Sequence, residues 1–170
     1  MGIKRGSTSR NSCGLAARQR VSGHDQQTDV SVFNSAIAFN VTGPLVPVGV
    51  QFNYGMLMQS TIVADNAPLD VAGDTITGSH NLIKNAYAGT NLPMDTITLD
   101  PKLGPLAFNG GTTRTHALGA NGPALNNGAN PASYPKDQRG PAFRRVVGMP
   151  DIGAFEYDAD HIIGDGVDLK

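Results

Sequence analysis

The chain has 170 residues, which corresponds to about one domain. Lysine and arginine number 13 and aspartate and glutamate 14, so the net charge of -1 excludes a strongly basic nucleic-acid binder, which needs an excess of clustered cations. Gly (21) and Pro (11) are abundant and Glu156 is the only glutamate, so the composition excludes a helix bundle and favours an all-β fold rich in turns.

The charges are unevenly distributed along the chain. Residues 1–20 carry five cations and no acid, whereas residues 151–170 carry six acids and one lysine. Residues 1–29 are polar, show no sustained hydrophobic period and are predicted to form a poorly ordered N-terminal segment with at most one short strand. They contain the single cysteine, Cys13, so no intramolecular disulfide can form, and no signal peptide is visible in them.

Residues 30–99 contain three segments with short apolar stretches, separated by loops with Gly and Pro. The segments echo one another, because Ile37, Ile62 and Ile83 follow at intervals of 25 and 21 residues and an asparagine comes soon after each. Such a period indicates a solenoid, in which stacked coils bury the side chains that one coil cannot bury alone. We expect β-helix coils with an asparagine ladder at their turns. An ordinary antiparallel sandwich is the alternative.

A strand is expected at 96–99, and beyond it the pattern becomes irregular. Residues 100–150 hold most of the prolines, so no regular element should run far there. Scattered apolar residues nevertheless indicate a packed segment. We predict a C-terminal cap region over residues 100–157, whose role is to cover the last coil and its unpaired strand edges, followed by an acidic tail at 158–170.

The cap region contains an ordered series of sequence blocks. They read DPKLGPLAFNGG from Asp100, THAL from Thr115, GPALNNG from Gly122, DQRG from Asp137 and DIGAFEY from Asp151. In this order they resemble the C-terminal region of bacterial right-handed parallel β-helix (pectin-lyase-like) repeat proteins with a choice-of-anchor domain of the Q type. The resemblance covers about residues 30–157. It implies a right-handed parallel β-helix of few coils followed by an irregular Gly/Pro-rich cap.

The sequence departs from that family at three positions. Phe108 and Asn126 stand where the family usually has aspartate, and Thr112 stands where it has proline. If those acids bind a metal in relatives, the equivalent site is in question here. Helices of this family are several times longer, so we expect the chain to be a fragment whose uncapped first coil favours self-association.

The best-preserved blocks are interpreted as structural. Arg139 is expected to pair with Asp151 or Glu156 through a bidentate bond that locks the cap. The full set of predicted structural cap residues is Asp100, Asn109, Gly110, Gly111, His116, Asp137, Arg139, Gly140, Asp151, Gly153 and Glu156.

Asp65, Asp70 and Asp74 form an alternative acidic cluster. A polysaccharide lyase on this fold would need clustered acids for Ca²⁺ and a basic residue, and a glycosidase would need two carboxylates facing one groove. No Arg or Lys lies between Arg20 and Lys84, so a local base is lacking. We assign no catalytic, cofactor-binding or metal residue. Ca²⁺ is the one ion left open, at these acids or in the acidic tail.

The resemblance implies a non-catalytic structural or adhesive end module of a secreted or surface-displayed bacterial β-helix protein. Its partners would be a surface polysaccharide or further copies of itself, with no nucleic acid and no transmembrane segment. An extracellular or cell-surface location is implied by the resemblance alone. The alternatives are a fragment of a pectin-lyase-like polysaccharide-degrading enzyme, either lyase or glycoside hydrolase, and a self-associating module without a present function.

Overall fold

The computed structural model describes residues 15–19, 28–40 and 48–159, and within them the fold is all-β, with no helix. Side chains are described for residues 30–40 and 49–159. The strands are β1 (Leu15–Gln19), β2 (Thr28–Phe33), β3 (Ala36–Ala38), β4 (Val48–Gln51), β5 (Met56–Gln59), β6 (Ile62–Ala64), β7 (Leu69–Ala72), β8 (Ile76–Thr77), β9 (Leu82–Ile83), β10 (Leu103–Phe108) and β11 (Arg114–Leu118).

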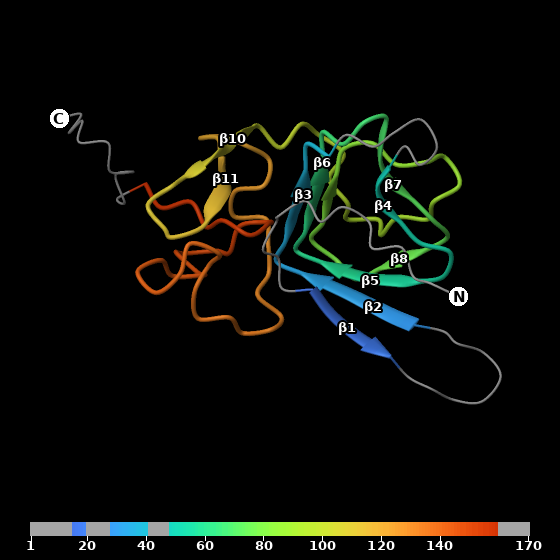
Figure 1. Cartoon of the computed structure of the whole chain (residues 1–170), viewed down its shortest axis with the longest axis horizontal. Helices are drawn as coiled ribbons and strands as arrows, with labels where there is room; N and C mark the ends of the chain where they lie inside the picture. The colour runs from blue at the N-terminus through green and yellow to red at the C-terminus, as the bar shows by residue number, and fades with distance from the viewer. Residues whose placement is uncertain (1–14, 20–27, 41–47, 160–170) are drawn as a thin grey trace, which may run out of the picture.

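The strands between β2 and β9 belong to three sheets that the chain visits in turn (Figure 1). The first sheet has the order β1-β2-β5-β8, the second β3-β6-β9 and the third β4-β7. Every pairing among β2 to β9 is parallel, and only β1 adds to the first sheet in the antiparallel sense. The antiparallel sandwich considered as an alternative is therefore wrong.

The first and second sheets share the same spacing between parallel partners. Val30 lies opposite Met56 in the first sheet and Ala36 opposite Ile62 in the second, so one circuit through the sheets takes 26 residues. The next circuit takes 20 residues, since Ile62 lies opposite Leu82. The predicted intervals were each wrong by one residue. A shift of one residue moves a side chain to the other face of a sheet, so Ile62 faces away from the side that Ile37 and Ile83 share.

The chain continues past β9 in the same manner, but with single bridges in place of strands. Ala86 pairs with the third sheet, Asn91 with the first and Ile97 with the second, each in the parallel sense. The strand expected at 96–99 is thus reduced to one bridge, between Ile97 and Leu82.

The turns between the first and second sheets have the same backbone conformation in each circuit. Asn34, Ser60 and His80 occupy equivalent register positions and all have a positive φ, of 45°, 53° and 56°. At the far end of the second sheet, the Asn40 Nδ2 atom donates to Asn66 Oδ1 over 2.8 Å. This hydrogen bond links asparagines of two successive turns, as expected for an asparagine ladder, but it joins one pair only. Asn85 does not continue it, because its side chain donates instead to the Pro68 carbonyl.

The first hydrophobic core lies between the three sheets. Its buried members come from every sheet, and their side chains are at most 5% exposed. They are Val32, Met56, Met58, Val63, Val71, Ile76 and Ile83.

A second core covers the opposite face of the second sheet. Adjacent residues of a strand point to opposite faces, so Ile62 and Leu82 enter this core while their neighbours Val63 and Ile83 enter the first. The cap region supplies the other side of the second core through Leu118, Ala124, Ile152 and Phe155. The cap was predicted to cover the last coil. Instead it packs against the flank of the second sheet (Figure 1).

The cap also contains one regular element that the sequence analysis missed, the antiparallel hairpin of β10 and β11. Pro105 hid it, because proline has no N–H to donate to a strand partner. The structure accommodates Pro105 within a register irregularity between Leu103 and Leu106, in a sheet of only two strands.

The N-terminal segment and the acidic tail lie largely outside the described residues. Of residues 1–29, the structure describes β1 and the first two residues of β2, so regular structure begins before the predicted boundary at residue 30. Of the tail at 158–170, only Asp158 and Ala159 are described.

The cap approaches the second sheet closely at Gly153, and this predicts a measurable asymmetry between two glycines. Gly153 has φ +105°, and an added Cβ would lie 2.9 Å from Ile62 Cδ1. Gly140 has nearly the same φ, +107°, but open space around it. Gly140→Ala should cost about 1–2 kcal/mol from backbone strain alone. Gly153→Ala should cost about 1–3 kcal/mol more from overpacking, as measured by denaturant unfolding.

Ile62→Val, which removes the atom in contact, should recover part of the additional loss in the Gly153→Ala background and none of the loss in Gly140→Ala. If both alanine variants lost the same free energy of unfolding, the close packing of Gly153 against Ile62 would be contradicted.

Candidate functional site

The most unusual chemical feature of the molecule is a group of five charged side chains buried inside the cap. Three are carboxylates and two are guanidiniums, and none is more than 7% exposed. We call this group the cap ion network, and its members are Asp137, Arg139, Arg145, Asp151 and Glu156. Buried charges are tolerated only when they are paired and hydrogen-bonded.

Arg139 is held by both charge and aromatic contacts. Its guanidinium pairs with Asp137 over 2.7 Å and also donates to the backbone carbonyl of Glu156. Its Cζ atom lies 4.0 Å from the ring centroid of Phe143 and 3.9 Å from that of Phe155, so two cation–π contacts enclose it. The predicted pairing of Arg139 with the Asp151 or Glu156 side chain is therefore wrong, because the acid two residues earlier is nearer.

Glu156 pairs instead with Arg145, a residue that the sequence analysis did not assign to the site. Arg145 Nη1 donates to Glu156 Oε2 over 2.8 Å, and Nη2 donates to the carbonyls of Asp151 and Gly153. The backbone N–H groups of Val147 and Asp151 donate to the same carboxylate. One signal was available in the sequence, since Arg145 lies only six residues before the DIGAFEY block that contains the lone glutamate.

Asp151 receives backbone donors rather than a cation. The N–H of Asn126 donates to Oδ1 over 2.7 Å, and the N–H of Tyr157 donates to Oδ2 over 2.6 Å. Asp137 likewise accepts the N–H of Glu156. The acids of the network thus serve as acceptors for loop N–H groups that no strand ladder satisfies.

The other predicted cap residues close turns around this network. Asn109 donates twice to Thr115 at the end of the hairpin, and Gly110, at φ +89°, lies against the Phe143 ring. Gly111 approaches the backbone of Arg139 too closely for any side chain.

Two predicted cap residues lie away from the network. His116 Nδ1 donates to the Gly104 carbonyl across the hairpin. Asp100 is exposed and accepts from the N–H of Lys102 and from Lys84, and these two bonds lower the pKa of its carboxyl.

The three acids of the alternative cluster do not form one site. Asp65 accepts a hydrogen bond from Lys84 and forms an ion pair with it. Asp70 is buried and accepts two bonds from Asn66, and burial raises the pKa of its carboxyl. Asp74 is exposed, with the hydroxyl of its neighbour Thr75 3.4 Å away. Within the described ranges, no group of three or more His, Cys, Asp or Glu side chains could hold a metal ion.

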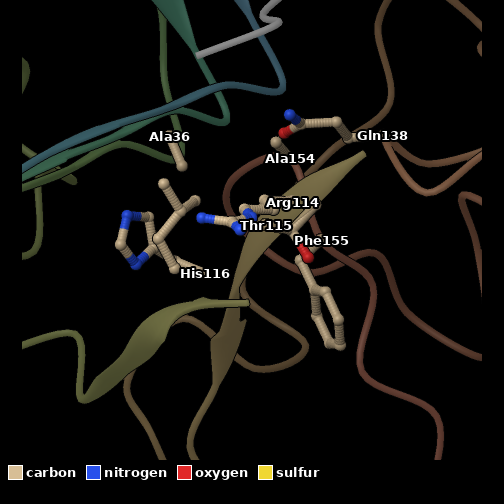
Figure 2. Close-up of a pocket in the computed structure, with 8 residues that line it drawn as sticks. Ala36, Arg114, Thr115, His116, Gln138, Ala154 and Phe155 are labelled. Atoms are coloured by element: carbon tan, nitrogen blue, oxygen red, sulfur yellow. The ribbon is translucent and has the colours of Figure 1, made fainter. Parts of the chain in front are cut away.

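One hollow opens beside the hairpin, between β3 and the cap (Figure 2). It encloses about 10 Å³, near the lower limit for a single water molecule. Pockets for small ligands are usually 300–1,000 Å³, so this hollow can receive at most one water molecule or a single terminal atom of a ligand. The residues that line it are Ala36, Leu106, Arg114, Thr115, His116, Gln138, Ala154 and Phe155.

Comparison of the chain with protein-family models, curated proteins and solved structures finds no match. No helix in the described part of the chain is long and apolar enough to span a membrane. The acids Asp160, Asp165 and Asp168, for which Ca²⁺ was left open, lie outside the described residues.

The burial of the Arg145–Glu156 pair predicts a large loss of stability when it is broken. Arg145→Met should lower the free energy of unfolding by about 3–5 kcal/mol, because it leaves the Glu156 carboxylate buried without its cation. Lys84→Met provides the control, since Lys84 pairs with Asp65 at the surface and should cost about 1 kcal/mol or less. Comparable losses in urea unfolding would show that the buried pair has no special role.

The network also predicts how stability depends on pH. Burial raises the pKa of Glu156 to about 7 from its ordinary value of 4.5, and burial raises the pKa of Asp151 as well. Between these two values the folded chain retains a proton that the unfolded chain releases. The contribution of Glu156 to stability should therefore be largest at pH 4.5 and should decline as the pH rises to 7.

The measurement is the free energy of unfolding of the wild type minus that of Glu156→Gln, at intervals from pH 4.5 to 8. The difference isolates this carboxyl from the histidines that titrate in the same range. It should decrease with rising pH and level off above 7, whereas the same difference for Asp100→Asn should not decrease in that range. A difference for Glu156→Gln that increases with pH would refute the assignment.

Proposed function

We propose that the chain is the C-terminal end module of a bacterial right-handed parallel β-helix protein of the choice-of-anchor Q type, secreted or displayed on the cell surface. Its role in this proposal is structural or adhesive, and it performs no catalysis. The observation that carries the proposal is the common register, in which parallel partners recur 26 and then 20 residues apart in both the first and second sheets.

The turns and cores support the same interpretation. A β-helix coil needs the same turn at the same place in each circuit, and Asn34, Ser60 and His80 have this property. It also needs an interior lined by apolar side chains from every sheet, as found in the first core. The cap adds an irregular segment whose ion network is fully internal, which suits a stabilising element better than a binding site.

The non-catalytic role rests on how the candidate acids are used. Asp65 forms an ion pair with Lys84, and the buried carboxylate of Asp70 accepts a hydrogen bond from the Asn66 side chain. A glycosidase requires two carboxylates that face one open groove, and a lyase requires a free base near its acids. Neither arrangement is formed by these residues, so no observation favours the enzyme alternative.

The test is incubation of the purified chain with polygalacturonate, alginate and xylan, with and without Ca²⁺. We expect no release of reducing ends and no new unsaturated ends. A parallel sedimentation assay with insoluble polysaccharides measures adhesion. Product release that is lost in Asp65→Asn or Asp70→Asn, but retained in the exposed control Asp95→Asn, would overturn the proposal in favour of a polysaccharide-degrading enzyme.

A further inference from the structure

An exposed surface on the cap hairpin combines aromatic, aliphatic and cationic side chains. Leu106 lies opposite His116 in the hairpin register, and Phe108 lies opposite Arg114. Residues directly opposite each other in an antiparallel pair share a face, so these four side chains lie together. Phe39 extends the group, since its ring centroid is 4.9 Å from that of His116. We call these five residues the hairpin patch.

The apolar members of the hairpin patch are unusually exposed for their size. Phe108 is 62% exposed, Phe39 49% and Leu106 43%. Single exposed apolar residues are ordinary, but a contiguous group of them marks an interaction surface. Aromatic residues and arginine are also the side chains that are enriched in protein–protein interfaces.

The hairpin patch has one cation in a defined position. The Arg114 Cζ atom lies 5.1 Å from the Phe108 ring centroid, which orients the guanidinium without consuming its hydrogen-bond donors. Among the described residues Arg114 has no ion pair, whereas Arg139 and Arg145 each have a buried one. Arg114 is thus available to an acid from outside.

The hollow beside the hairpin provides the place for that acid. Arg114 and His116 both line it, with Ala36 as a further wall (Figure 2). The Gly104 carbonyl can only accept, so the bond to it fixes the Nδ1–H form of His116 and leaves Nε2 without a partner among the described residues. The small volume admits no more than a single terminal oxygen, so an acid would meet Arg114 at the mouth of the hollow.

We propose that the hairpin patch is a docking surface for a protein partner that presents a carboxylate between apolar side chains. The carboxylate would lie at the mouth of the hollow and accept from the exposed Arg114 in a charge-assisted bond, while its apolar neighbours pack on Phe39, Leu106 and Phe108. A sugar fits this surface less well, because the hydroxyls around its ring need many polar partners and three of the five residues offer none. This surface goes beyond the structural role proposed above and does not depend on it.

The test is a titration of the full chain, followed by amide NMR, with the capped tripeptide acetyl-phenylalanyl-glutamyl-leucine amide. Shifts should be confined to β10, β11 and the residues around Phe39, and the same peptide with glutamine in place of glutamate should bind at least about tenfold more weakly. Arg114→Ala should weaken binding of the acidic peptide by a similar factor. Lys136→Ala, an exposed cation outside the hairpin patch, should leave it unchanged.

Three results would overturn the proposal. The first is an equal response to the glutamate and glutamine peptides, and the second is an equal loss in the Arg114→Ala and Lys136→Ala variants. The third is tighter binding of trigalacturonate than of the peptide at the same residues, which would assign the hairpin patch to acidic glycans. Since Arg114 is exposed, the spectrum of the free variant should match that of the wild type outside the hairpin.

Discussion

The structure depends on a sheet that is buried on both faces. In β6 and β9, alternate residues enter two different cores, so Ile62 and Val63 are both fully buried although they point in opposite directions. Strands of this kind are continuous apolar runs, because neither face meets water. The second sheet therefore joins the parallel circuits to the cap, and neither hydrophobic core is complete without it.

Buried carboxylates in the cap accept hydrogen bonds from backbone N–H groups that have no strand partner. A segment rich in Gly and Pro cannot pair its backbone in long ladders, so its N–H groups need other acceptors. The carboxylates of Asp137, Asp151 and Glu156 accept six such N–H groups, and the two arginines balance most of the resulting charge. Three carboxylates against two guanidiniums leave one negative charge in excess, which agrees in direction with the raised pKa of Glu156. The DQRG and DIGAFEY blocks supply four of the five members of this network.

The cap ion network and the exposed hairpin patch lie on different parts of the cap. The five charged residues of the network are buried and bind one another and the surrounding backbone. The surface that remains free to contact a partner lies on the hairpin, where Phe108 and Arg114 are exposed side by side. The hollow beside this surface is lined by Ala36 of β3 and by cap residues. It therefore exists only because the cap packs against the second sheet.

The sequence by itself determined the all-β class and the repeated short strands, because glycine, proline and apolar spacing act locally, and it drew attention to four of the five residues of the cap ion network. It did not determine the register of the strands. Ile37, Ile62 and Ile83 look equivalent in sequence, but Ile62 is one residue out of register with the other two and therefore points to the opposite face of the sheet. Nor could it choose between Asp137, Asp151 and Glu156 as partners for Arg139, because all three acids lie within reach along the chain. The flank position of the cap was decided only by the tertiary structure, since it depends on contacts between segments far apart in the sequence. The hairpin and the Arg145–Glu156 pair join segments close in the sequence, but Pro105 concealed the first, and the second depends on how the cap loops fold around a buried carboxylate.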